Sequence, residues 1–168
     1  MTAQLVLDRV PAVFSLDISL REPRFTGIEH RPLTGPDLLV AAARAQTIRL
    51  SFSPQTPRIA DLADRVRLAE QAIGAAGRRR GDVRVLLDLD VVIAPDARTA
   101  RRKRAELEYL DALSGLTWSP AETRVVTTAE LLVDEVSELA ERAGVDGVVL
   151  HPLSGGDRVE QELRALIG

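Results

Sequence analysis

The sequence contains no cysteine and few aromatic residues. Without cysteine, its 168 residues cannot form a disulfide scaffold, a CxxC redox centre or a zinc site with thiolate ligands. Three phenylalanines, one tyrosine and one tryptophan are too few for a platform on which nucleic-acid bases stack. The 22 basic residues are outnumbered by 25 acidic ones, and the net charge of -3 argues against a nucleic-acid partner.

Long apolar runs and common catalytic motifs are also missing. No run approaches the roughly 18 apolar residues of a membrane helix, and the first residues, MTAQLVLDRVP, have no signal-peptide pattern. We therefore expect a cytoplasmic protein with no membrane partner. The sequence lacks GxGxxG, Walker, GxSxG and HExxH motifs, and its two histidines, His30 and His151, are too far apart in sequence for a metal motif. We treat residues 1–168 as one domain.

Strand-like and helix-like segments alternate along the chain. Runs of apolar and β-branched residues predict four strands, at 12–20, 47–53, 83–93 and 145–150. Caps, prolines and apolar spacing predict helices over about 36–45, from Thr56 to Gly77, from Asp96 to just before Gly115, over about 128–143, and after the SGGD sequence at 154–157. Thr127 and Glu130 have capping-box spacing. The alternation predicts an α/β fold whose parallel strands lie side by side in chain order.

The first three predicted strands carry polar side chains on one face only. Alternate residues of a strand point to opposite sides of a sheet. The polar side consists of Ser15, Asp17, Ser19, Arg49, Ser51, Ser53, Arg84, Asp88 and Asp90. We therefore expect helices on the other, apolar face. The polar face lies either in water, in a small two-layer α/β domain, or inside a partial (half) TIM-barrel-like sheet, because a full barrel needs eight strands and typically about 250 residues.

A half-barrel has two open sheet edges. Proteins usually cover or pair such edges. We therefore expect the chain to form a homo-oligomer, and a two-fold dimer is the commonest arrangement.

The polar face is the first candidate site. Asp17, Arg49, Asp88 and Asp90 form either an ion-pair network that neutralises a half-buried surface or a ligand site, since charged groups in a cleft are where pKa values are perturbed. Their shared face predicts that Arg49 contacts Asp17 or Asp88.

The end of the last predicted strand is the second candidate site. His151 follows this strand, where catalytic residues of α/β folds collect, although a lone histidine can equally be structural. Ser154, Gly155 and Gly156 form either an ordinary capped turn or a phosphate site built from free N–H groups at a helix start. In the second case, Arg49 and Ser51 would extend the site toward a ring or sugar.

Two basic runs, Arg78–Arg80 and Arg101–Arg104, are expected to be solvated surface. The second run has acidic partners at helical spacing. We expect the ion pairs Arg102–Glu106 and Arg104–Glu108.

Three segments together resemble a known family. They read AAARAQTIRLSFSP, then AAGRRRGDVRVLLDLDVVIAPDARTARRKRAELEYL, and finally TTAELLVDEVSELAERAGVDGVVLHP. Over about residues 38–152 the chain resembles the C-terminal half of the luciferase-like flavin-dependent monooxygenases, which include F420-dependent oxidoreductases. The resemblance implies a (βα)8 barrel that binds FMN or F420, usually as a dimer.

The resemblance leaves two functions open. The N-terminal half of the barrel, with much of the flavin and substrate site, has no counterpart here, and only the strand AVFSLDISL within residues 1–35 is expected to stand in for part of it. No catalytic residue of the family matches a position in this sequence. The first hypothesis is a truncated luciferase-like oxidoreductase that binds FMN or F420 and acts on a small molecule. The second is a non-catalytic interaction module that keeps the fold and dimerises through its sheet edges.

Overall fold

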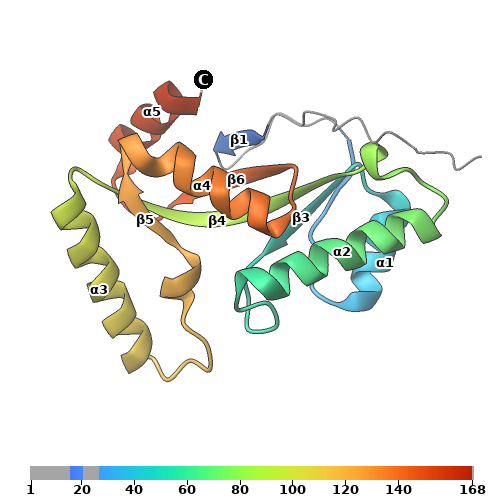
Figure 1. Cartoon of the computed structure of the whole chain (residues 1–168), viewed down its shortest axis with the longest axis horizontal. Helices are drawn as coiled ribbons and strands as arrows, with labels where there is room; N and C mark the ends of the chain where they lie inside the picture. The colour runs from blue at the N-terminus through green and yellow to red at the C-terminus, as the bar shows by residue number, and fades with distance from the viewer. Residues whose placement is uncertain (1–15, 21–26, 168) are drawn as a thin grey trace, which may run out of the picture.

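A computed structural model describes residues 16–20 and 27–167 and contains a six-stranded sheet whose strand pairs are all parallel (Figure 1). In chain order the strands are β1 (Asp17–Leu20), β2 (Glu29–His30), β3 (Thr47–Ser51), β4 (Arg84–Ala94), β5 (Val125–Thr128) and β6 (Gly147–Pro152). The helices are α1 (Gly35–Arg44), α2 (Ile59–Ala75), α3 (Ala97–Leu113), α4 (Ala129–Ala143) and α5 (Gly156–Ile167). The α/β class with parallel strands is thus confirmed. No helix in the described part of the chain has the length and hydropathy of a membrane span.

The order of the strands corrects one expectation. The sheet runs β1-β6-β4-β3-β2, so β3, β4 and β6 are neighbours as predicted, but β1 lies beside β6 and not beside β3. The outer edge of β3 is taken by β2, from a segment predicted to be a polar loop, where Glu29 pairs with Thr47. Because that edge is occupied, β1 forms its ladder on the free edge of β6, with Asp17 opposite Gly147.

A further strand, β5, lies where the sequence predicted the start of a helix. Val91 of β4 pairs with Pro152 on one side and with Val125 on the other, so β5 follows β3 along the same edge of β4. The Thr127–Glu130 capping box is therefore wrong. Thr127 is a strand residue whose hydroxyl donates to Glu135 Oε1 at 2.9 Å, and α4 begins after Thr128 without a side-chain cap.

The helix boundaries otherwise follow their local signals. Thr34 and Asp37 form a capping box at the start of α1. Gly144 ends α4 with a left-handed φ of 75°, which glycine adopts without steric cost. The start of α2 differs from the prediction, because the Thr56 hydroxyl donates to the carbonyl of Ser51 at 3.1 Å. That bond closes the end of β3, and α2 begins at Ile59.

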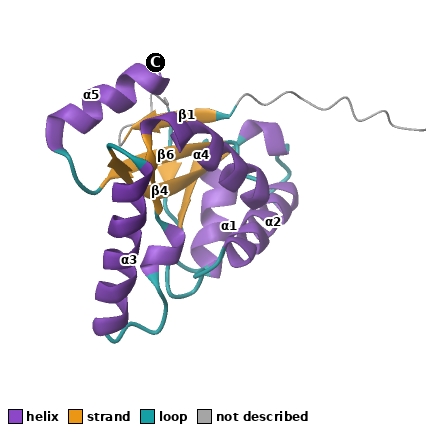
Figure 2. Cartoon of the chain, turned by 60° about the vertical axis from the view of Figure 1, so that its left-hand side comes forward, coloured by secondary structure: helices purple, strands orange, loops and turns teal. Residues whose placement is uncertain are grey.

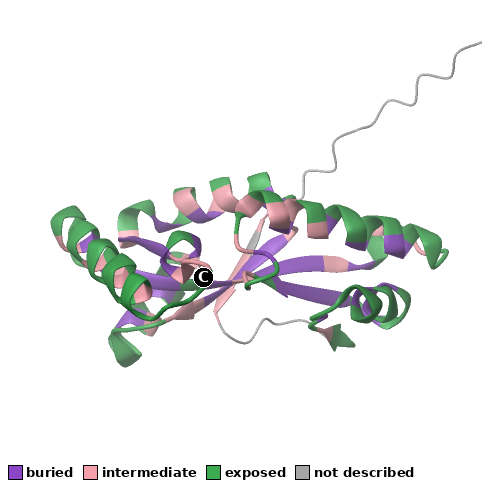
Figure 3. Ribbon diagram, turned by 90° about the horizontal axis from the view of Figure 1, so that it is seen from below, coloured by how far each residue is buried: buried purple, intermediate pink, exposed green. Residues whose placement is uncertain are grey.

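The core lies between one face of the sheet and the helices, as Figure 3 shows by the buried residues along the strands and the row of helices beside them. Alternate residues of β3, β4 and β6 form its sheet side, namely Ile48, Leu50, Val85, Leu87, Leu89, Val91, Val148 and Leu150. Buried residues of α1, α2, α4 and α5 pack against them. The helix-side face is apolar as predicted, whereas the opposite face is mixed, because it carries the buried Leu86, Val92 and Val149 beside its polar side chains.

Asp96 at the start of α3 predicts a pH effect on stability. Its carboxylate accepts from the backbone N–H of Thr99 at 2.7 Å, and this bond holds the pKa of Asp96 below its ordinary value. The charged cap thus stabilises the fold above the unfolded pKa of about 3.9, and this contribution is lost as the pH falls through the lower folded pKa. We expect Asp96→Asn to lower the melting temperature near neutral pH. The difference from wild type should vanish toward pH ~2; an unchanged difference would contradict the role of the charge.

Candidate functional site: the polar face of the sheet

Four strands contribute charged or polar side chains to one cluster on the face opposite the core. Glu29 comes from β2, Arg49 from β3, Asp88 from β4 and His151 from β6. The parallel register brings them together, because Ser51 lies opposite Asp88 and the next position on the same face of β4, Asp90, lies opposite His151. We call Glu29, Arg49, Asp88 and His151 the polar cluster.

Arg49 is the buried centre of the polar cluster. Its residue surface is 3% exposed, and its Nε donates to Asp88 Oδ1 at 2.9 Å. Its two terminal nitrogens donate to Asp88 and to Glu29, the latter at 3.1 Å. The expected contact between Arg49 and Asp88 is therefore confirmed, whereas the side chain of Asp17 lies outside the described part of the structure. The carboxylates of Asp88 and Glu29 compensate the charge of the buried Arg49. The contacts between Arg49 and Asp88 hold the Asp88 carboxylate in place.

His151 completes the cluster at the carboxyl end of β6. Its Nε2 lies 3.1 Å from Asp88 Oδ1, and because an ionised carboxylate only accepts hydrogen bonds, Nε2 carries the proton and donates it. Arg49 lies 3.4 Å from the same nitrogen, but as a donor it cannot bond to a protonated Nε2. In the tautomer that carries its proton on Nε2, Nδ1 is an acceptor. With 33% of the His151 side chain exposed, this nitrogen belongs to a group that solvent or a ligand can reach.

Asp90 and Ser51 are exposed polar residues beside the cluster. Among the described residues, the side chain of neither forms a hydrogen bond or ion pair. The carboxylates of Glu29, Asp88 and Asp90 share this region with Arg49, with Arg84 on the same face of β4 and with Arg31, which pairs with Glu29 at 3.4 Å. The donors of Arg49 are already used by Asp88 and Glu29, so they are not free for a phosphate.

Ser154 and Gly155 lie in the exposed turn between β6 and α5, and the exposed Gly156 is the first residue of α5. Gly155 has a φ of +106°, and a Cβ there would lie 2.1 Å from Val159 Cγ2. Close packing on α5 therefore explains this glycine without a ligand. The amide groups at the start of α5 keep this turn a candidate phosphate site. The Asp157 carboxylate in the first turn of α5 opposes this role, because it repels an anion.

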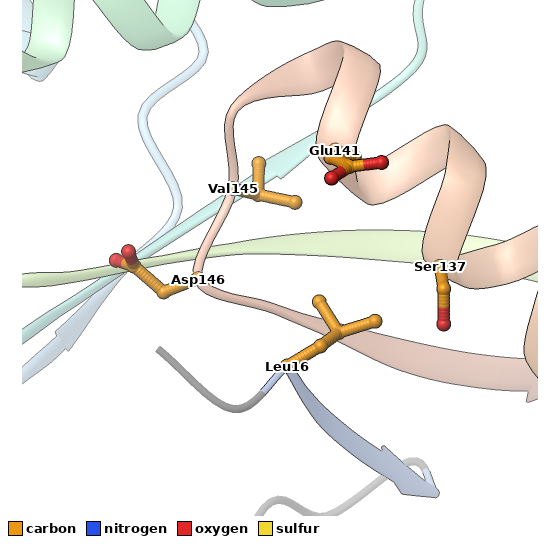
Figure 4. A pocket seen from close by; sticks show the side chains of 5 residues that line it. All are labelled: Leu16, Ser137, Glu141, Val145 and Asp146. Atoms are coloured by element: carbon orange, nitrogen blue, oxygen red, sulfur yellow. The ribbon is translucent and has the colours of Figure 1, made fainter. Parts of the chain in front are cut away.

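A small pocket lies at the other end of the strands. It has a volume of about 240 Å³ and is lined by Leu16, Ser137, Glu141, Val145 and Asp146 (Figure 4). Asp146 points away from Ser137 and Glu141 and bonds to Arg80 and to the backbone N–H of Val85. Because the pocket is at the amino end of β6, it is separate from the polar cluster. Among the described residues, no group of three or more His, Asp or Glu side chains is placed to hold a metal ion.

The sequence pattern does not indicate that Glu29 and His151 belong to the polar cluster. Glu29 lies in a Pro/Gly-rich segment whose strand has only two residues, too short for an alternating pattern. His151 was considered separately because the last strand was predicted to end at residue 150. Continuing the strand by one residue would have placed His151 on the same face as Asp88 and Asp90.

Comparison with known proteins agrees with the fold. No protein-family model matches the sequence, and no curated protein matches it. Solved structures do match. They include EDTA monooxygenase (EmoA) from Chelativorans sp. BNC1, with a TM-score of 0.61, 16% identity and coverage of 82% of this chain and 42% of that chain. Riboflavin lyase (RcaE), solved with modified FMN and riboflavin, has a TM-score of 0.60 and 20% identity, again covering 82% of this chain and 42% of that one.

An F420-dependent secondary alcohol dehydrogenase, solved with an F420-acetone adduct, also matches, with a TM-score of 0.62, 12% identity and coverage of 88% of this chain and 51% of that chain. The chain thus spans between 42% and 51% of the length of these three proteins. At these identities the likeness concerns the fold. The chain has the fold of part of a luciferase-like monooxygenase or F420-dependent oxidoreductase, a partial TIM-barrel-like sheet with its helices on one face.

Proposed function

We propose that the polar face binds FMN or F420 and serves an oxidoreductase reaction on a small molecule. The observation that carries this proposal is the pair formed by His151 and Asp88, 3.1 Å apart, on the face of the sheet that no core helix covers. In barrels of this type, the carboxyl ends of the strands are where catalytic residues collect. The fold likeness to flavin- and F420-dependent enzymes supports the choice of cofactor.

The residues of the face would act in distinct ways. A bound flavin or deazaflavin would supply the hydride or electron acceptor. Asp88 orients His151 and fixes the proton on Nε2, so that Nδ1 can take up a proton from a bound molecule. Arg49 is a positioning residue, because its donors are used by Asp88 and Glu29. Ser51 and Asp90 offer a hydroxyl and a carboxylate for hydrogen bonds to the polar edge of a ring.

The charge of the face decides where each part of the cofactor fits. The carboxylates around Arg49 disfavour the phosphate of FMN but can accept hydrogen bonds from N–H groups of a ring. The phosphate would instead meet the amide groups of Ser154, Gly155 and Gly156. The polar cluster would thus bind the ring of the cofactor, and residues 154–156 would bind its phosphate.

Cofactor binding is tested by titrating the 168-residue chain with FMN and with F420 while recording ligand fluorescence and backbone amide shifts. We expect the amides of residues 151–156 to shift, and His151→Ala to weaken binding at least tenfold. His30→Ala is the matched control, because it removes the other histidine, which lies on the edge strand β2. If neither ligand at millimolar concentration moves these amides, or if both variants bind alike, the proposed site is wrong.

The second candidate function is a non-catalytic interaction module. It is favoured by the open edges of the sheet, since among the described residues β1 pairs only with β6 and β2 only with β3. Such edges are templates for pairing with another chain. If this is the function, hydrogen exchange at the amides of Asp17–Leu20 should slow as the protein concentration rises. Titration with FMN or F420 should then change neither the ligand fluorescence nor the amide shifts.

A further inference from the structure

Helix α3 presents an unusual outer surface. Four large apolar residues at its end and in the following turn are exposed: Tyr109 (64%), Leu110 (52%), Leu113 (66%) and Leu116 (53%). Figure 2 shows α3 standing apart from the pair formed by α1 and α2. Only Ala100 of α3 is buried. Contiguous exposed apolar side chains of this kind mark interaction surfaces.

The outer side of α3 is divided along the helix axis. At 100° per residue, the side opposite the half-buried Leu107 carries basic residues in the first half of the helix and apolar residues in the second. We call this side the α3 ridge. In chain order it consists of Arg98, Arg101, Arg102, Ala105, Tyr109, Ala112 and Leu113. Glu106 and Glu108 flank it.

The charges beside the ridge are not neutralised within the chain. The expected pair Arg104–Glu108 is wrong, because Arg104 turns toward β5 and donates to the carbonyl of Val126 at 2.7 Å. The expected pair Arg102–Glu106 does not form either. Among the described residues, Arg101, Arg102, Glu106 and Glu108 have no ion-pair partner.

We infer that a second copy of this chain docks on the α3 ridge, with the two α3 helices antiparallel about a two-fold axis. Antiparallel pairing places the basic half of each ridge against the apolar half of the other, with the flanking Glu106 and Glu108 beside the contact. With the axis near Ala105, Arg101 of one copy faces Glu108 of the other. Arg102 meets Tyr109, in reach of a cation–π contact. The small side chain of Ala105 allows the helices to approach closely at the centre.

The arrangement of the ridge favours a second copy over other occupants. A helix that lies on a lipid surface has its cations and its apolar residues on different sides of the helix, whereas here they follow one another along the same side. The ridge is complementary to itself, which is what an isologous contact requires. This interface is also distinct from the edges of β1 and β2, and it does not depend on whether the polar face binds a cofactor.

The inference is tested by analytical ultracentrifugation of the 168-residue chain over a wide concentration range. We expect a dimer of 18.3 kDa protomers, and Leu113→Glu should raise its dissociation constant at least tenfold. Leu68→Glu is the matched control, because Leu68 of α2 is also exposed (55%) and the change adds the same charge elsewhere. Circular dichroism of both variants confirms that they fold.

A charge exchange tests the register. Arg101→Glu and Glu108→Arg should each weaken the dimer, because each places like charges opposite one another, and the double variant should restore it. A wild-type chain that stays monomeric at all concentrations would overturn the inference. So would a dimer that Leu113→Glu leaves intact, which would locate the contact at the sheet edges, or a double variant no tighter than the single ones.

Discussion

Replacing Arg49 by alanine should lower the free energy of unfolding by about 2–4 kcal/mol. Arg49 is 3% exposed, and its guanidinium donates to both Asp88 and Glu29. Its removal leaves two carboxylates and a histidine on a half-buried surface without their cation. Urea unfolding of the 168-residue chain, followed by circular dichroism, measures the change.

Arg31→Ala is the matched control for this result. Arg31 also pairs with Glu29, at 3.4 Å, but 59% of its side chain is exposed. Exposed ion pairs contribute at most about 1 kcal/mol, so Arg31→Ala should have little effect. Arg49→Lys should lie between wild type and Arg49→Ala, because lysine restores the charge but not the two-pronged contact with Asp88. An unchanged unfolding midpoint in Arg49→Ala would show that water solvates Asp88 and that the cluster does not depend on Arg49.

Asp146→Ala should lower the free energy of unfolding by about 2–3 kcal/mol, because it leaves a buried donor unpaired and removes an ion pair. The carboxylate of Asp146 accepts from the backbone N–H of Val85 at 2.7 Å and from Arg80 at 2.8 Å. Val85 is fully buried, so water does not replace the lost partner. Thermal and urea unfolding should both record the loss.

The comparison with Asp146→Asn separates the two contacts. An asparagine oxygen can still accept from the Val85 N–H but carries no charge for Arg80. We expect Asp146→Asn to be more stable than Asp146→Ala. If the two variants are equally unstable, the ion pair with Arg80 accounts for the whole effect, and the hydrogen bond to Val85 contributes nothing measurable.

The fold was predictable where local pattern and tertiary structure agree. The alternation of apolar and polar residues in 83–93 predicted both the strand and its two faces, because β4 is long enough to repeat the pattern several times. The missed strands β2 and β5 have two and four residues, which is too few for periodicity. Their extended conformation comes from pairing with β3 and β4, and a helix separates each of them from its partner in the sequence.

The candidate site was predictable in part for the same reason. Arg49 and Asp88 lie on long, alternating strands, so their contact followed from the shared face. The position of Glu29 does not follow from strand alternation, because β2 has only two residues. The burial of Arg49 beside a single carboxylate is the signal that suggests a second carboxylate partner. The position of β1 depends on which sheet edge is free. Because β2 pairs with the outer edge of β3, β1 pairs with β6.

The pairing of β1 with β6 joins the two ends of the described chain, since Asp17 lies opposite Gly147. During synthesis on the ribosome, β1 therefore waits for its partner until residues 147–150 have been made. The β4–β6 pairing, with Val85 and Asp146 61 residues apart, is also delayed. Contacts of this sequence separation slow folding and prolong the exposure of strand edges. We expect the nascent protein to be most vulnerable to aggregation just before residues 147–152 emerge, and least so once β6 has closed the sheet.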